Sequence, residues 1–116
     1  MSIAKELTAN PIGQAVTKRA TEDIPAYRFV GLDGSLCGAG EKAHGISGLE
    51  IPSGKLGPVD RLGDLVVEAG AAVTAGVEVE SNASGQAIPK TTGVPNGYAL
   101  TAATAAGQKV LIVRGI

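Results

Sequence analysis

Apolar and polar residues alternate most clearly between residues 63 and 88. In residues 77–80 two valines alternate with two glutamates, a period of two that is typical of a strand with one face in a core. We therefore expect both glutamates to face water. An apolar run at residues 65–69 predicts a second strand, and the sequence Asn-Ala-Ser-Gly at residues 82–85 predicts a turn.

Short β-type segments recur along the rest of the chain. Residues 27–32 predict a strand, and Asp33-Gly34 predicts a hairpin, because a type I′ turn needs positive φ at both central residues. KVLIVR, residues 109–114, is rich in β-branched residues and predicts a central strand buried on both faces. Strands about ten residues apart, separated by Gly, Pro and Asn and without an amphipathic helix, predict an all-β fold. Either a small β-barrel or a sandwich fits this pattern.

Residues 1–26 differ from the rest because they are polar and interrupted by prolines. We interpret them as an extended N-terminal arm with a short strand at residues 14–18, preceding a single β domain over residues 27–116. Two interpretations of the arm are open: a disordered tail, or a segment that becomes ordered on a neighbouring subunit. The second is favoured by its widely spaced apolar residues, Ile3, Leu7 and Ile12.

Composition limits the core that these strands can build. Hydrophobic residues make up 44% of the 116 residues, but only 3% are aromatic and Trp is absent. Burial of a Val, Leu or Ile contributes roughly 1.5–3 kcal/mol and burial of Ala much less. The single Cys37 excludes an intrachain disulfide, and the single His excludes a Cys/His zinc cluster. We therefore expect this lean core to be stabilised by oligomerisation or by docking onto a larger partner.

Charge and hydropathy exclude two classes of partner. The formal net charge is −1, with both signs interspersed, whereas a nucleic-acid-binding surface needs clustered Lys and Arg. The N-terminus lacks the apolar region of a signal peptide, and no run approaches the roughly 20 apolar residues of a membrane span. We expect a soluble protein, made in a reducing cytoplasm, that binds neither nucleic acid nor membrane.

Candidate reactive residues are few. Cys37 and His44 could form a thiolate–imidazolium pair, but nothing nearby in the sequence would activate the thiol, and a buried Cys commonly acts as a small hydrophobe. The glycines at residues 38–40 lack the strand–loop–helix context and the GK[ST] ending of a phosphate-binding loop. Three carboxylates lack the spacing of a calcium loop: Asp60, Asp64 and Glu68. The sequence thus predicts no catalytic, cofactor or metal site, and a protein that is not an enzyme.

Four segments in succession carry a family resemblance: residues 20–40, HGIS at 44–47, residues 63–88, and NGYALTAATAAGQKVLIVRGI at 96–116. Together they resemble the capsid cement (decoration) proteins of tailed bacteriophages. Members of that family typically show a short hairpin, an EAGAAVTAG-type segment followed by a Gly turn, and a closing GYAL-type segment. The likeness covers roughly residues 20–116 and rests on Ala, Gly and Val patterns without reactive residues.

The resemblance implies a small β-barrel or sandwich, often trimeric, on the outer face of a mature phage head. Its partner would be the major capsid protein, its place the capsid surface after synthesis in the host bacterium, and its role the bridging of neighbouring capsomers. Contact with the shell or a sister subunit is then expected at the arm and at the loop over residues 49–58, through Ile3, Leu7, Ile12, Leu49, Ile51 and Pro52. The alternatives are a virion-surface fibre-base or display module on the same fold, and a small enzyme or ligand binder using Cys37 and His44.

Overall fold

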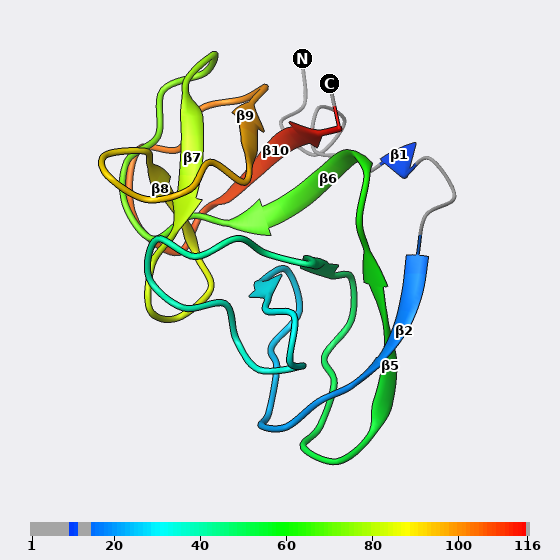
Figure 1. The fold of residues 1–116 in the computed structure, drawn as a ribbon. Helices are drawn as coiled ribbons and strands as arrows, with labels where there is room; N and C mark the ends of the chain where they lie inside the picture. Colours follow the sequence, from blue (N-terminus) through cyan, green and yellow to red (C-terminus); the bar gives the residue numbers. More distant parts are fainter. Residues whose placement is uncertain (1–9, 12–14, 116) are drawn as a thin grey trace.

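The computed structural model describes residues 10, 11 and 15–115, and in these residues the chain folds into two antiparallel β-sheets without a helix (Figure 1). Neither sheet closes into a barrel, so the predicted all-β class is confirmed in its sandwich-like form. No helix in the described part of the chain has the length and hydropathy needed to span a membrane. The strands are β1 (Asn10–Pro11), β2 (Ala15–Arg19), β3 (Phe29–Val30), β4 (Gly45–Ser47), β5 (Leu56–Asp60), β6 (Gly63–Glu68), β7 (Glu78–Ser81), β8 (Ala87–Pro89), β9 (Gly97–Ala99) and β10 (Lys109–Arg114).

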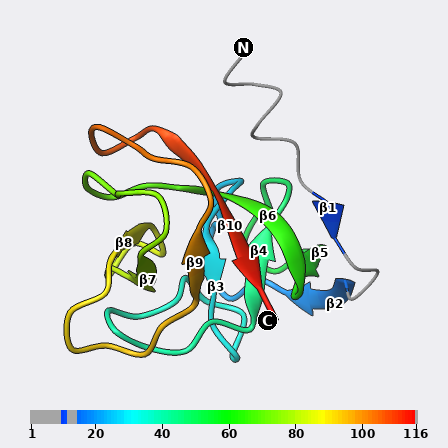
Figure 2. The ribbon, with the colours of Figure 1, turned by 90° about the horizontal axis from the view of Figure 1, so that it is seen from above.

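The larger sheet has six strands in the order β1-β6-β10-β9-β7-β8. Figure 2 shows β10 between β9 and β6, the central position predicted for KVLIVR. Val110 and Ile112 are fully buried, and Leu111 is only 8% exposed. In β6, buried residues alternate with half-buried ones, as expected for a strand whose two faces differ in burial.

The smaller sheet has four strands in the order β2-β5-β4-β3. β2 corresponds to the strand predicted at residues 14–18 and pairs with β5 along its full length. After β2 the chain buries Ile24, whose backbone pairs with that of Ile51. Residues 15–24, part of the predicted arm, are thus integral to this half of the molecule. Residues 1–9 lie outside the described residues, so an arm there stays a prediction.

One continuous stretch of chain passes from the smaller sheet to the larger. β5 ends at Asp60, and after a corner at Arg61 and Leu62 the chain enters the larger sheet as β6 (Figure 1). Gly63 adopts a φ of 104° at this corner, a left-handed conformation that glycine accepts without a Cβ penalty. The two sheets are therefore joined at a sharp bend rather than by a long linker.

The smaller sheet contributes residues to two hydrophobic cores. Phe29 and Val30 are neighbours in β3 and point to opposite faces, since successive strand side chains alternate. Phe29 packs in the main core with residues of the larger sheet, and Val30 packs in a second core with Ile24, Ile51 and Val59. The main core consists of Phe29, Cys37, Ala43, Ile46, Leu65, Val67, Ala69, Val73, Val79, Ala87, Ala99, Ala103, Val110 and Ile112.

Two local predictions are wrong. The predicted hairpin at Asp33-Gly34 forms, since Val30 pairs antiparallel with Leu36, but its turn is not type I′, because only Gly34 of these two residues has positive φ, at 88°. Gly34 N–H donates to the carbonyl of Gly31, and Gly31 N–H donates to that of Ser35, at 3.2 and 2.8 Å. Glu80, expected in water, is only 6% exposed. Its carboxylate accepts hydrogen bonds from the backbone N–H groups of Thr91 and Gly93, at 2.6 and 3.0 Å. These bonds compensate for the lost hydration, which makes burial of the carboxylate tolerable.

Candidate binding surface

The predicted contact residues divide into three groups. Ile3, Leu7 and Ile12 lie outside the described residues. Leu49 is 63% exposed and Pro52 is also exposed, in the turn between β4 and β5. Ile51 is only 2% exposed, because two backbone hydrogen bonds with Ile24, of 2.9 and 2.8 Å, fix it against the second core. Its side chain therefore packs inside the chain, whereas Leu49 and Pro52 remain available at the surface.

We call the exposed end of the smaller sheet the tip, defined by Leu49, Pro52 and Leu56. Leu56 opens β5 and is 59% exposed. Figure 1 places the connection from β4 to β5 at the end of the molecule remote from the larger sheet. The side chains of the tip can therefore reach another protein without moving any core residue.

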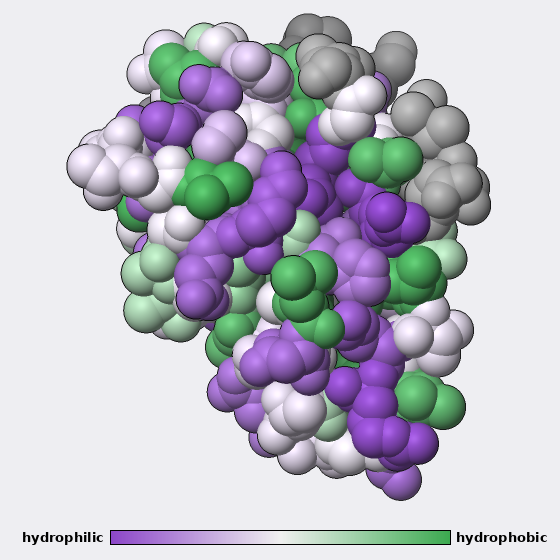
Figure 3. All heavy atoms as spheres, viewed as in Figure 1, coloured by the Kyte–Doolittle hydropathy of each residue, from purple (hydrophilic) through white to green (hydrophobic). Residues whose placement is uncertain are grey.

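Other exposed apolar residues were not predicted as contacts. Leu32 is 68% exposed and Tyr98 is 42% exposed, with Val94 and Leu100 at similar values to Tyr98. On the face shown in Figure 3, apolar side chains stand as separate groups among polar ones. Such a mosaic is the ordinary composition of a protein surface, and a non-obligate interface differs little from it in apolar content.

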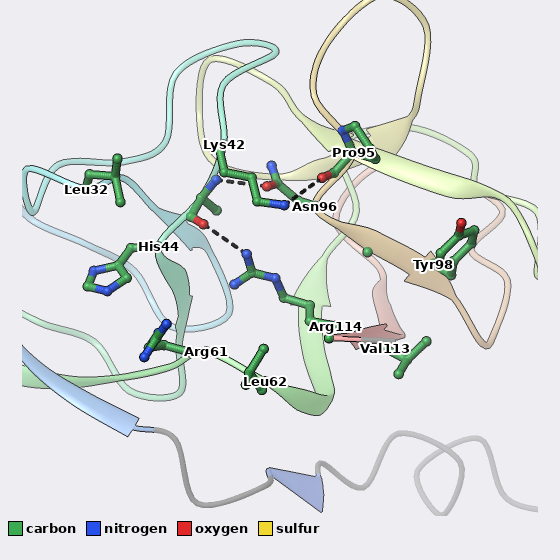
Figure 4. Close-up of a pocket in the computed structure, with 13 residues that line it drawn as sticks. Leu32, Lys42, His44, Arg61, Leu62, Pro95, Asn96, Tyr98, Val113 and Arg114 are labelled. Carbon is green, nitrogen blue, oxygen red and sulfur yellow. Dashed lines mark hydrogen bonds between the residues drawn. The ribbon is translucent and has the colours of Figure 1, made fainter.

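A pocket of about 450 Å³ opens where the two sheets meet, and we call it the junction pocket (Figure 4). Five segments far apart in the sequence form it: Leu32 after β3, the stretch before β4, the β5–β6 corner, the stretch entering β9, and the end of β10. The pocket therefore exists only in the folded chain. Its lining is Leu32, Lys42, Ala43, His44, Arg61, Leu62, Pro95, Asn96, Gly97, Tyr98, Val113, Arg114 and Gly115.

Arg114 occupies the middle of the junction pocket and is only 8% exposed. Its Nη2 donates a hydrogen bond of 2.9 Å to the carbonyl of Ala43, whereas the buried Nη1 has no hydrogen-bond partner among the described residues. Burial lowers the pKa of Arg114; the nearby Cys37 partly offsets this effect, and the charge of Arg61 lowers the pKa further. The pocket thus contains a cation that its surroundings only partly compensate.

His44 lies in the same positive environment. Lys18 Nζ is 2.8 Å from His44 Nδ1, so Nδ1 must accept and the ring proton belongs on Nε2. Burial lowers the pKa of His44, and the charges of Lys18, Arg61 and Arg114 lower it further. The imidazole is therefore kept neutral by the cations around it.

Asn96 holds the stretch before β4 in place. It is 1% exposed; its Oδ1 accepts a hydrogen bond from Ala43 N–H at 2.8 Å, and its Nδ2 donates to the carbonyl of Glu41 at 2.9 Å. In addition, Lys42 Nζ donates to the carbonyl of Pro95 at 3.2 Å. An Asn-Gly pair is typical of a turn or a break in a strand, but this pattern cannot show that the asparagine is buried between two loops.

The structure gives Cys37 and His44 separate environments. Cys37 is 1% exposed, and its thiol donates to the carbonyl of Glu41 at 3.3 Å. Burial raises the pKa of this thiol, which opposes formation of a nucleophilic thiolate. Within the described residues, no group of three or more Asp, Glu, His or Cys side chains is arranged to hold a metal ion.

The three carboxylates that lack the spacing of a calcium loop are Asp60, Asp64 and Glu68. Among the described residues, Glu68 is the one of the three that takes part in an ion-pair network. Arg28 Nη2 lies 2.9 Å from Glu68 Oε2, and Lys109 Nζ lies 3.5 Å from Oε1. Gln86 Nε2 also donates to Oε2, at 2.6 Å. Burial alone would raise the pKa of Glu68, but the hydrogen bond from Gln86 and the two cations outweigh burial and lower it. This network lies between the two sheets and has a structural role.

Comparison with known proteins identifies the family. A model of the phage cement protein family matches residues 10–114. The chain belongs to this family. Membership makes it a non-enzymatic structural component of the phage virion, located at the capsid surface.

The fold has a counterpart among solved structures. The N base of head fiber gp8.5 of bacteriophage phi29 aligns with a TM-score of 0.71 and 25% sequence identity. The alignment covers 87% of this chain and 92% of that chain. A search of curated proteins finds no match.

Proposed function

We propose that this cement protein binds the outer surface of the mature phage head and stabilises contacts between capsomers. The match of the family over residues 10–114 carries the proposal. A protein that binds only the expanded shell stabilises that state by RT ln(1 + [L]/Kd) at each site. Because a head offers many equivalent sites, modest contacts at each one add up to a large effect on the whole shell.

The partner in this proposal is the major capsid protein, and the binding unit is a homotrimer of this chain. The lean core supports an assembly: among its members Phe29 is the one aromatic residue, and alanines fill several positions. Light scattering on the purified protein measures the mass directly. A mass of three chains supports the trimer, and a monomer at the concentrations used to decorate heads contradicts it.

The tip and the N-terminal segment supply the contacts to the shell or to a sister subunit. Leu49 and Pro52 support this role because they are exposed at the end of the smaller sheet. Ile3, Leu7 and Ile12 supply the apolar side chains of the N-terminal segment. Ile51 is left out of the contact set because its side chain is buried.

The test of function compares phage heads with and without the protein. Heads that carry it should release DNA at a higher temperature, and should survive osmotic shock in larger numbers, than heads from which it is absent. Adding purified protein back should restore both properties. Equal release temperatures with full occupancy would show that the protein decorates the head without cementing it.

Two variants test the contacts. Leu49→Ser should lower occupancy on heads, whereas Leu100→Ser, which changes a leucine that is 45% exposed elsewhere, should not. Deletion of residues 2–9 removes Ile3 and Leu7 but spares β2, which pairs with β5 along its full length. Reduced occupancy with an unchanged melting temperature supports the arm, and unchanged occupancy refutes it.

A second candidate function is a fibre-base or display module on the virion surface. The similarity to the phi29 head fiber base favours it. Such a module would occupy the head through one face and present another to a fibre or to the host. Heads that bind the protein without gaining thermal stability would support this function over cementing.

A further inference from the structure

The junction pocket concentrates positive charge in a chain whose formal net charge is −1. Its lining contains the cations Lys42, Arg61 and Arg114 and the neutral His44, but neither Asp nor Glu. The ion pairs found in the described part of the chain both involve Glu68, which is not in the lining. The cations of the pocket therefore have no carboxylate partner within the described residues.

Arg114 is the buried cation of this pocket, and its hydrogen bonding is incomplete. It is only 8% exposed, and one terminal nitrogen is used by the carbonyl of Ala43 while Nη1 has no partner in the described part of the chain. A buried charged donor left without an acceptor is unfavourable. Figure 4 shows the guanidinium between the segment carrying His44 and the corner carrying Arg61. Arg61 and Arg114 repel each other, so an anion placed between them would relieve the repulsion.

The rim of the pocket is apolar. Leu32 is 68% exposed and Tyr98 is 42% exposed, and Leu62 and Pro95 complete the wall. A free inorganic anion would leave these side chains in water. A carboxylate on a peptide, with an apolar residue beside it, would satisfy the cations and cover the rim together. The volume of about 450 Å³ is large enough for one or two side chains but not for a folded element.

We propose that the junction pocket binds an Asp or Glu side chain, flanked by apolar residues, from the major capsid protein. The carboxylate lies between Arg61 and Arg114, and the flanking apolar residues pack on Leu32 at one side of the pocket and on Tyr98 at the other. The choice of the capsid protein as its source rests on the proposed function. The junction pocket is then a second contact region besides the tip, and charge complementarity makes the pocket specific for an acidic segment.

The first experiment tests the chemistry without phage heads. Acetyl-Leu-Glu-Leu-amide is titrated into the isotopically labelled protein while amide resonances are followed by NMR, and acetyl-Leu-Gln-Leu-amide is the uncharged control. The Glu peptide should shift the amides of Ala43, His44 and Gly115, and salt should weaken its binding. Identical shifts from both peptides, or shifts located elsewhere, would overturn the proposal. So would stronger binding of inorganic phosphate at the same amides.

Charge variants connect the pocket to the peptide. Arg61→Gln should weaken binding of the Glu peptide by about fivefold, the effect of losing one partly exposed ion pair. Arg19→Gln removes one charge from an exposed arginine outside the pocket and should leave peptide binding unchanged. If Arg114→Gln does not fold, Arg114→Lys is used in its place, because it retains the positive charge. Equal peptide affinity for the Arg61 and Arg19 variants refutes the assigned position of the carboxylate.

The second experiment measures occupancy on heads. If wild-type protein and Arg19→Gln decorate heads while Arg61→Gln does so poorly, the capsid protein is supported as the source of the carboxylate. If Arg61→Gln instead lowers the mass of the oligomer, the occupant is a second copy of this chain and the proposed source is wrong. If wild-type protein does not bind heads at all, the proposed function fails, whereas the peptide titration still decides the chemistry of the pocket.

Discussion

Replacing Glu68 with glutamine tests how the two sheets are held together. Glu68 ends β6 in the larger sheet, and Arg28 immediately precedes β3 in the smaller one. Their side chains are 18% and 17% exposed and meet at 2.9 Å. Arg28 Nη1 also donates to the carbonyl of Ser84 at 3.0 Å, and Nε is buried without a hydrogen-bond partner, so among the described residues Glu68 is the one charged partner of this guanidinium. The substitution keeps the shape and one acceptor oxygen but removes the charge.

The expected cost follows from the interactions that a neutral glutamine cannot make. A hydrogen bond between charged groups contributes roughly 1.5–3 kcal/mol. The more exposed pair with Lys109, at 3.5 Å, contributes about 0–1 kcal/mol. Because glutamine retains part of the Arg28 contact, we expect Glu68→Gln to lower the free energy of unfolding by about 2 kcal/mol at pH 7. Glu50→Gln, which changes an exposed carboxylate, should stay within about 0.5 kcal/mol of wild type.

The pH dependence separates charge from packing. The pKa of Glu68 is lowered in the folded protein from its ordinary value of 4.5. Such a group contributes stability that is fully present above the unfolded pKa and is lost as pH falls through the folded pKa. The difference between wild type and Glu68→Gln should thus be constant from neutral pH down to about pH 5 and should shrink below about pH 4.5.

Urea unfolding followed by circular dichroism, at a series of pH values, measures this difference. A Glu68→Gln variant as stable as Glu50→Gln at pH 7 would refute the role of the ion pair. A loss of stability that persists unchanged when Glu68 is protonated would assign the effect to packing instead.

Three further predictions concern folding and accessibility. Ile24→Ala should lower the free energy of unfolding, measured in urea, by about 2–5 kcal/mol, because it opens a cavity in the second core. Val94→Ala, at a 43% exposed position, should lower it far less. Equal losses would contradict the placement of Ile24. Gly45→Ala places a methyl group against the backbone oxygen of Asp60 and should lower the melting temperature by the equivalent of about 1–3 kcal/mol, a loss that an unchanged melting curve would exclude. Cys37, buried and with a raised pKa, should react with a thiol reagent only as the protein unfolds, and rapid labelling of the native protein would show that the thiol is accessible.

Apolar and β-branched runs predicted the strands that contribute most to the main core. β6 and β10 follow this rule, because such runs fit a strand that is largely buried. The family resemblance indicated the capsid surface as the location of the protein and a structural role for it, and a burial pattern can indicate neither. Neither the burial pattern nor the resemblance could reveal residues whose environment is created by a distant segment.

Sequence patterns did not predict the environments of three buried residues: Glu80, Ile51 and Arg114. Glu80 occupies a polar position in an alternating strand, but a turn at residues 91–93 approaches it and donates two backbone hydrogen bonds. Ile51 lies in a Pro- and Gly-rich loop without periodicity, and its burial depends on pairing with Ile24. Arg114 ends an apolar strand and would ordinarily reach water, yet the stretch before β4 covers it. All three depend on long-range packing, which local patterns do not encode.

The central position of β10 has a consequence for biosynthesis. β10 pairs with β6 on one side and β9 on the other, yet it is the last of the ten described strands to leave the ribosome. Until it arrives, those neighbours have unpaired edges and the main core lacks Val110 and Ile112. Unpaired edges favour association between chains. Chains interrupted before residue 109 should therefore aggregate or be degraded, so that the pool available for assembly is limited to chains that have completed β10.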